Sequence, residues 1–186
     1  MIRKIIEAHI ETAQKLLLQE AEIQAVCNAC WNAVNNGNKI FLAGNGGSAA
    51  DAQHIAAELV GRFTTERRAL PALALTTDTS VLTSVGNDYG FENIFSRQIE
   101  AFAQEGDIFI AISTSGTSKN IIKAVEAAQL KKVKTIGFLG YSGGILKNMV
   151  DLPLVISCDN TARIQEMHIL VGHIVCAYIE EKITVV

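Results

Sequence analysis

Hydroxyl side chains are concentrated in the segment STSGTS, residues 113–118, directly after the apolar run DIFIAI. The apolar run predicts a buried strand, and the spacing from Lys119 to Leu130 predicts a helix, so the hydroxyls stand at a helix N-terminus. Free backbone N–H groups and the helix dipole favour an anion at such a point. One hydroxyl would be enough to cap the helix. Because the segment carries five, we predict a site for a phosphate monoester.

A glycine-rich segment, GNGGS, begins at Gly44 after the run KIFLAG and precedes a helix expected to start near Ser48. Glycines here permit a tight turn and a close approach of backbone to ligand. The pattern Gly44-x-Gly46-x-x-Ala49 also matches a dinucleotide fingerprint, but no acidic residue closes a second strand about 20 positions later, as a ribose contact requires. The lysine of a Walker motif is missing too. A nicotinamide cofactor and a nucleoside triphosphate are therefore both disfavoured at this loop.

The helix after this loop carries a possible acid/base or metal-binding pair. His54 and Glu58 are four residues apart, so both project from one face. In isolation they would be a solvated pair, but at the rim of a pocket the carboxylate suits a general base and both suit a metal ion. The segment SVGNDYG places Asn87 and Asp88 toward the same crevice, although ordinary turn chemistry also explains an Asn-Asp pair.

These segments require a scaffold that brings them to one edge. Residues 2–36 show helical spacing with a break near Gln19 and Glu20, which predicts two helices. Strand-like runs alternate with helical segments over the rest of the chain, at 39–44, 71–76, 107–113, 134–140 and 151–157. Near-continuous apolar strands joined by helices predict an α/β fold, a three-layer α/β/α sandwich with a five-stranded parallel sheet. In such sheets ligands bind beyond the carboxyl ends of the strands.

The last helical segment, 161–183, is apolar over most of its circumference and therefore needs burial on several sides. A sheet covers one side, so we expect a subunit interface to cover the other. Within this segment Gln165 and His173 are eight positions apart, a rise of about 12 Å. This separation favours pockets that neighbouring chains share.

Composition limits the class of protein. The 186 residues, 49% of them hydrophobic, predict one domain, 1–186, with residues 1–36 as an N-terminal helical extension. A net charge of −3 without a basic run argues against nucleic acid or a membrane surface as partner. Without a signal peptide or an apolar stretch of about 18 residues, we expect a cytoplasmic location. Cys27 and Cys30 form a CxxC, but no second pair stands at ligand spacing, so all four cysteines are expected to pack in the core.

Three separated motifs together resemble a known family. NGGS at 45–48, STSGTS at 113–118 and ARIQEMH at 162–168 look like those of the sugar isomerase (SIS) domain, specifically the phosphoheptose isomerases. The resemblance extends over nearly the whole chain. It implies the conversion of sedoheptulose 7-phosphate to D-glycero-D-manno-heptose 7-phosphate, toward the heptose of bacterial lipopolysaccharide. It also implies a homotetramer.

The resemblance assigns roles to individual residues. It implies that Glu58 is the general base, that His173 is the partner acid/base, and that Gln165 holds substrate between them. Several members bind Zn2+ through residues that match His54, Glu58, Gln165 and His173. The remaining residues assigned to substrate are Asn45, Gly46, Gly47, Ser48, Asn87, Asp88, Ser113, Thr114, Ser115 and Ser118. The chain departs from some members at Ala162, where they have an aspartate, so that carboxylate is absent or supplied elsewhere.

The chemistry is consistent with these roles. Aldose-ketose interconversion moves a proton between C1 and C2 through an enediol, which one carboxylate can do. A histidine that titrates near neutrality suits ring opening, while zinc could instead orient the oxygens or polarise the carbonyl. Two alternatives remain open: a non-catalytic relative that associates with the bacterial replication initiator, and an isomerase of another sugar phosphate, such as arabinose 5-phosphate. The presence of both Glu58 and His173 favours an enzyme.

Overall fold

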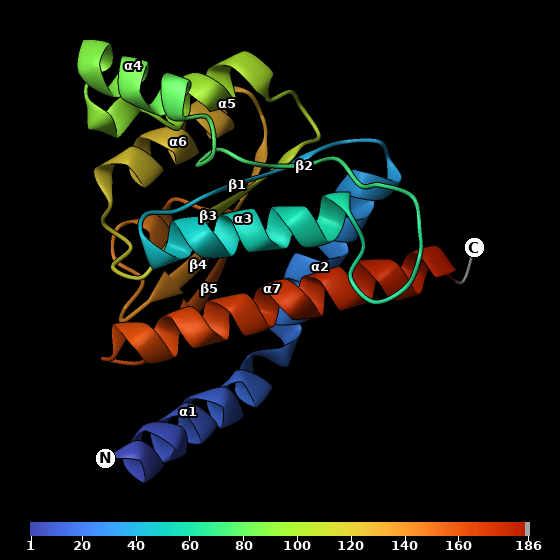
Figure 1. Cartoon of the computed structure of the whole chain (residues 1–186), viewed down its shortest axis with the longest axis vertical. Coiled ribbons are helices and arrows are strands. Elements are labelled where there is room, and N and C mark those ends of the chain that lie inside the picture. Colours follow the sequence, from blue (N-terminus) through green and yellow to red (C-terminus); the bar gives the residue numbers. More distant parts are fainter. Residues whose placement is uncertain (185–186) are drawn as a thin grey trace.

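Helices and strands alternate along most of the chain, as the sequence predicts. The computed structural model describes residues 1–184 (Figure 1). The two predicted N-terminal helices are present, and their predicted break is a short 3-10 turn, η1. In chain order the elements are α1 (Ile2–Leu16), η1 (Leu17–Gln19), α2 (Glu20–Asn35), β1 (Ile40–Ala43), α3 (Gly47–Val60), β2 (Ala72–Ala74), α4 (Thr79–Tyr89), η2 (Phe91–Asn93), α5 (Ser96–Phe102), β3 (Ile108–Ser113), α6 (Lys119–Leu130), β4 (Lys134–Gly140), η3 (Leu146–Asn148), β5 (Leu152–Ile156) and α7 (Thr161–Thr184).

The five strands form one parallel sheet in the order β2-β1-β3-β4-β5, which confirms the predicted strands. The chain moves outward from β1 to β2 and then returns past β1 to add β3 on its other side. This reversal makes the boundary between β1 and β3 the topological switch point, where the carboxyl ends of the strands leave a crevice. The glycine loop follows β1 and the serine loop follows β3, so both lie at this point.

Both faces of the sheet are buried, and alternate strand residues contribute to different cores. Ile40 and Leu42 of β1 pack in a core with residues from α2, α3 and α7, whereas Phe41 and Ala43 pack in another with residues from α5 and α6. The period of two along a strand sends successive side chains to opposite faces. The predicted three-layer α/β/α sandwich is confirmed, with α3 and α7 side by side on one face (Figure 1).

The long helix α7 is covered mainly by the chain's own helices. It packs against α1, α2 and α3 as well as β4. The N-terminal helices and α3 thus supply much of the cover that the sequence left to a subunit interface, and the interface itself stays a prediction. Leu170 and Ile174 nevertheless remain 38% and 37% exposed.

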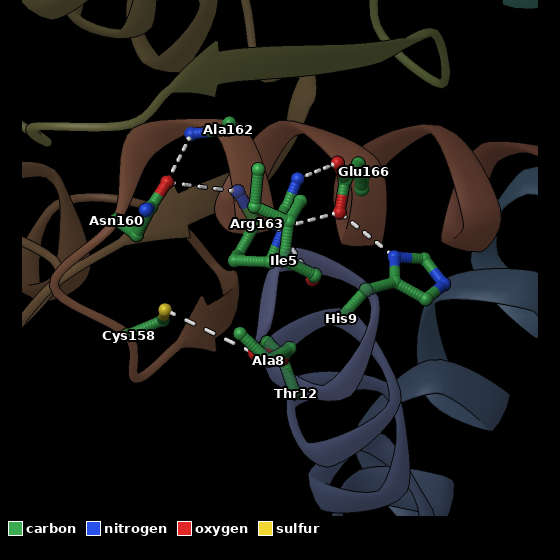
Figure 2. Close-up of polar contacts among 9 residues, drawn as sticks. All are labelled: Ile5, Ala8, His9, Thr12, Cys158, Asn160, Ala162, Arg163 and Glu166. Atoms are coloured by element: carbon green, nitrogen blue, oxygen red, sulfur yellow. Dashed lines mark hydrogen bonds and ion pairs between the residues drawn. The ribbon is translucent and has the colours of Figure 1, made fainter. Parts of the chain in front are cut away.

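Polar contacts attach α1 to the first turns of α7 (Figure 2). Arg163 donates from Nη1 to the carbonyl of Ile5 at 3.0 Å and from Nε to Glu166 at 2.6 Å. Glu166 also contacts Nδ1 of His9 at 2.7 Å. Burial raises the pKa of Glu166, but the hydrogen bonds from Arg163 and His9 outweigh it and lower the pKa overall. An ion-paired, half-buried carboxylate thus fixes where α1 leaves the domain surface.

The cysteines behave as core residues. Cys27, Cys30 and Cys176 are buried free thiols, and Cys158 is partly buried against the same core. Burial raises the pKa of Cys27 to about 11, so its thiol stays protonated at neutral pH. The core prediction for the CxxC is confirmed. None of the helices in residues 1–184 combines the length and the apolarity needed to cross a bilayer.

Candidate active site

The glycine loop and the start of α6 are joined across the switch point by a reciprocal amide pair. Asn45 donates from Nδ2 to Oδ1 of Asn120 at 3.0 Å, and Asn120 donates in return at 2.8 Å. Asn120 is buried in the first turn of α6. Two loops from different strands are thereby fixed relative to each other, which prepares their backbones for one shared ligand.

The third sequence motif reaches the same place through α7. A Cβ at Gly47 would lie 2.5 Å from Nε2 of Gln165, so only glycine allows the amide to approach this closely. Gly46, with φ of +54°, is the residue before α3. Ser48 is buried in the first turn of that helix. The structure therefore brings the glycine loop and Gln165 together.

The serine loop is folded by its own hydroxyls. Oγ of Ser113 accepts from the Gly116 N–H at 3.1 Å and lies 3.2 Å from Oγ of Ser118. Oγ of Ser115 accepts from both the N–H and the hydroxyl of Thr117. Ser118 is the N-cap residue of α6, yet its side chain makes no capping hydrogen bond. Helix capping therefore does not explain the Ser118 hydroxyl. An anion-binding role for the loop is the preferred interpretation.

At the other end of α3, three predicted residues meet. Nε2 of His173 lies 3.0 Å from Nε2 of His54, and the same His54 atom lies 3.3 Å from Oε1 of Glu58. The helical spacing sets His54 beside Glu58. His173 reaches them because Gly172 lets α7 approach α3: a Cβ there would lie 2.5 Å from Ile55 Cδ1. A carboxylate and two imidazoles, all partly exposed, form a unit capable of proton transfer.

The fit of this unit to a metal ion is partial. Ligand atoms around a tetrahedral zinc with bonds of about 2.0–2.1 Å are about 3.3 Å apart, close to the two separations that His54 makes. No group of three or more His, Cys, Asp and Glu side chains in the described chain, however, already has the arrangement of a metal site. Gln165, the fourth predicted ligand, lies against Gly47 instead. The donor types suit zinc, and the side chains would have to move to surround it.

Asn87 and Asp88 lie at the end of a helix, whereas ordinary turn chemistry was the alternative explanation of the pair. They are not in a turn but in the last turn of α4, which Asp78 caps by accepting from the Val81 N–H at 3.0 Å. Both are exposed, and Asn87 donates to Asp88 at 2.8 Å. The capped helix runs to Tyr89, and the turn follows at Gly90. Their placement toward the crevice stays a prediction.

Asp51 is a further acidic residue on this part of α3, and it was not among the predicted site residues. It shares the α3 face with His54 and Glu58, at spacings of three and seven residues, and that spacing was the available signal. Its Oδ2 is buried without a hydrogen-bond partner in the structure. Burial raises the pKa of Asp51 to about 6, and the nearby His54 lowers it only in part. An acidic group that titrates close to neutrality thus stands beside the imidazole pair.

Comparison with known proteins identifies the family. The SIS domain family model matches residues 4–140. The phosphoheptose isomerase of Geotalea daltonii is 53% identical over 96% of this chain and 95% of its own length. That of Nitratiruptor sp. is 53% identical over 97% of both chains. The chain belongs to the phosphoheptose isomerases of the SIS domain family.

Solved structures agree with this membership. The phosphoheptose isomerase of Francisella tularensis superimposes with a TM-score of 0.94 at 40% identity, covering 97% of this chain and 96% of that one. That of Neisseria gonorrhoeae gives a TM-score of 0.90 at 40% identity, covering 97% and 100%. The Vibrio vulnificus NanR protein complexed with ManNAc-6P, at 17% identity and a TM-score of 0.63, shares the fold alone. Ala162, where some members of the family have an aspartate, is exposed at the start of α7. Its N–H donates to Asn160 (Figure 2).

Proposed function

We propose that the chain is an aldose-ketose isomerase that converts sedoheptulose 7-phosphate to D-glycero-D-manno-heptose 7-phosphate, for the heptose of bacterial lipopolysaccharide. The observation that carries the proposal is the meeting of Glu58, His54 and His173 where α3 and α7 pack together. A non-catalytic relative would not need these three side chains to meet. The relatives named phosphoheptose isomerase, 53% identical over nearly the whole chain, support the same reaction.

In this mechanism Glu58 takes the proton from one carbon of the C1–C2 pair and returns it to the other, so the intermediate is an enediol. His173 exchanges protons with the sugar oxygens during ring opening and isomerisation. His54 contacts both groups and holds their relative orientation. The serine loop binds the phosphate. Asn45 and Gln165 bind the part of the sugar that lies between the phosphate and the reacting C1–C2 pair.

We propose zinc as a cofactor held by His54, Glu58, Gln165 and His173. When bound, the ion would orient the sugar oxygens or polarise the carbonyl. The two nitrogen donors and one carboxylate oxygen already stand near the spacing of zinc ligands. Because His54 contacts both Glu58 and His173, loss of His54 would remove a proposed zinc ligand and also a neighbour of the two acid/base residues.

We further propose a homotetramer in which α1 and the exposed part of α7 face other subunits. Ile2, Ile6 and Ile10 are exposed on α1. Leu170 and Ile174 line an apolar groove between α7 and the N-terminal helices, together with Leu16, Leu17, Ile23 and Tyr178. Contiguous apolar surface of this kind marks a protein interface. A second copy of the chain offers the same surface in return.

The arrangement along α3 supports pockets completed by more than one subunit. Gly47 and Glu58 are eleven residues apart, which is about 16 Å of helix rise. A single sugar phosphate bound by the loops at Gly47 would be far from Glu58 of the same chain. In the assembly we propose, the loops of one subunit face the Glu58, His54 and His173 of another.

The decisive experiment is an aldose-forming assay with sedoheptulose 7-phosphate, run beside shorter ketose phosphates. We expect the seven-carbon substrate to give the highest kcat/KM. Preference for a shorter ketose phosphate would support the alternative isomerase. Phosphate-ester binding without turnover of any substrate, with or without added zinc, would instead support the non-catalytic alternative.

A further inference from the structure

Residues 61–70, in the segment that joins α3 to β2, are attached at several points to the elements that carry the acid/base unit. We call these residues the strap. It leaves α3 at Gly61, passes over α7 and returns toward the sheet (Figure 1). Its ends are close together, since the Leu70 N–H donates to the carbonyl of Leu59 at 3.1 Å. Such a closed loop can be fixed by a few contacts at its middle.

The first attachment is a buried carboxylate on α7. Glu180 accepts the Thr64 N–H at 2.8 Å and the Thr65 hydroxyl at 2.7 Å, and also contacts the Thr65 N–H. Glu180 is only 3% exposed. Burial raises its pKa, but these hydrogen bonds outweigh burial and lower the pKa overall, so the group is ionised at neutral pH. Charge-assisted hydrogen bonds are stronger than neutral ones.

The second attachment is a guanidinium at the C-terminus of α3. Arg67 donates from Nη2 to the carbonyl of Glu58 at 2.6 Å, and from Nη1 to the carbonyls of Leu59 at 2.8 Å and Gly61 at 3.2 Å. These carbonyls have no partners within the helix, and a cation there also opposes the helix dipole. The contact fixes the backbone of Glu58 itself.

The third attachment reaches the imidazole. The ring of Phe63 lies 5.5 Å from that of His173, centroid to centroid, and the ring of His54 lies 5.0 Å from the same imidazole. Neighbouring rings on His173 restrict the orientations that its side chain can adopt. The residue that follows Phe63 in the strap, Thr64, is bound to Glu180 and so holds this part of the strap in place.

We propose that the strap positions the acid/base unit, and that Glu180, Arg67 and Phe63 are positioning residues for Glu58 and His173. Glu180 holds the middle of the strap on α7, Phe63 is thereby set against His173, and Arg67 fixes the end of α3 that carries Glu58. The inference rests on the proposed function, in which these two groups move protons. The strap lies at the opposite end of α3 from the glycine loop, so it acts on the reaction and not on phosphate binding.

The test is Glu180→Gln, which keeps the side-chain shape but removes the charge and one acceptor. We expect kcat to fall about tenfold with little change in KM, because small displacements near reacting groups reduce rate strongly. The exposed neighbour Glu181 provides the matched control, Glu181→Gln, with kcat unchanged. NMR should show the ring protons of His173 shifted in Glu180→Gln, in the same direction as in Phe63→Leu.

Unchanged kcat in Glu180→Gln, with the Thr64 and Thr65 amides exchanging faster than in wild type, would overturn the inference. If Glu180→Gln does not fold, Phe63→Leu decides: a lower kcat at constant KM supports positioning, and an unchanged kcat overturns it. Failure of the proposed function is distinguishable, since the wild type would then turn over no sedoheptulose 7-phosphate. The NMR comparison would still report whether Glu180 controls His173.

Discussion

At the scale of single residues, the structure makes Glu58 the strongest candidate for the proton-transferring base. We expect Glu58→Gln to lower kcat by at least ~10²-fold, the low end for a general acid/base. Phosphate affinity should stay near the wild-type value, because the serine loop belongs to another element. Steady-state kinetics and phosphate calorimetry would measure both, with Glu181→Gln as control. A variant that keeps more than about a tenth of wild-type kcat would exclude Glu58 as the base.

His168 is fully buried against β4, and we expect its titration to affect the stability of the fold. Its Nε2 lies 3.0 Å from the carbonyl of Leu139 and must donate to it, while Nδ1 is buried without a partner. Burial lowers the pKa of His168 from 6.5 to about 4, and the hydrogen bond to Leu139 only partly opposes this. Between these values the unfolded chain binds a proton that the folded chain does not.

The stability that neutral His168 contributes is therefore present above pH 6.5 and is lost as the pH falls toward 4. His168→Gln keeps a donor for Leu139 but does not titrate. Urea unfolding at a fixed protein concentration would measure the free energy of unfolding at pH 7.5 and at pH 5. This free energy should decrease less between the two pH values in the variant than in the wild type. We expect a difference on the order of 1–2 kcal/mol. Equal decreases in both proteins would contradict the assignment.

At the scale of elements, the serine loop is the most direct test of phosphate binding. We expect Ser115→Ala and Ser118→Ala each to weaken the binding of inorganic phosphate by ~1–3 kcal/mol, the range for hydrogen bonds to a charged group. Isothermal calorimetry would measure the loss. Ser84→Ala, which removes an exposed hydroxyl from α4, is the matched control. The anion-site interpretation would not survive if both loop variants bound phosphate as tightly as the control.

At the scale of the whole molecule, the structure determines which variants test shared pockets. Glu58, His54 and His173 meet within one chain, whereas the Asn45–Asn120 pair joins the start of α6, just after the serine loop, to the glycine loop that precedes α3. We therefore expect mixtures of Glu58→Gln chains with Ser115→Ala/Ser118→Ala chains to regain activity at low substrate concentration. If two subunits build each pocket, random mixing should leave about a quarter of the pockets intact.

Mixtures of Glu58→Gln with His173→Ala chains provide the control for this experiment. They should regain no activity, because neither chain supplies a complete acid/base unit. Subunit exchange would be confirmed with tagged chains. No recovery in the first mixture, despite exchange, would show that each chain builds its own complete pocket.

The sequence by itself determined the elements and the family. The apolar runs predicted the five strands because a sheet covered on both faces requires nearly continuous hydrophobic strands. The glycine and serine segments could be assigned to one edge, because the carboxyl ends of parallel strands share it. Local spacing also paired His54 with Glu58. Local sequence was less informative at Asn87 and Asp88. An Asn-Asp pair is typical of a turn, but both residues lie in α4, which Asp78 caps at its N-terminus.

Only the tertiary structure decided which distant residues meet. His173 reaches His54 because Gly172 has no side chain that would collide with Ile55 of α3. Gln165 reaches Gly47 for the same reason, since any side chain at Gly47 would collide with the Gln165 amide. The orphaned carboxylate of Asp51 and the attachment of the strap to Glu180 likewise depend on how α3, α7 and residues 61–70 are packed. Periodicity specifies which face of a helix is buried, but the packing partner and the register against it are set by interlocking side chains from separate parts of the chain.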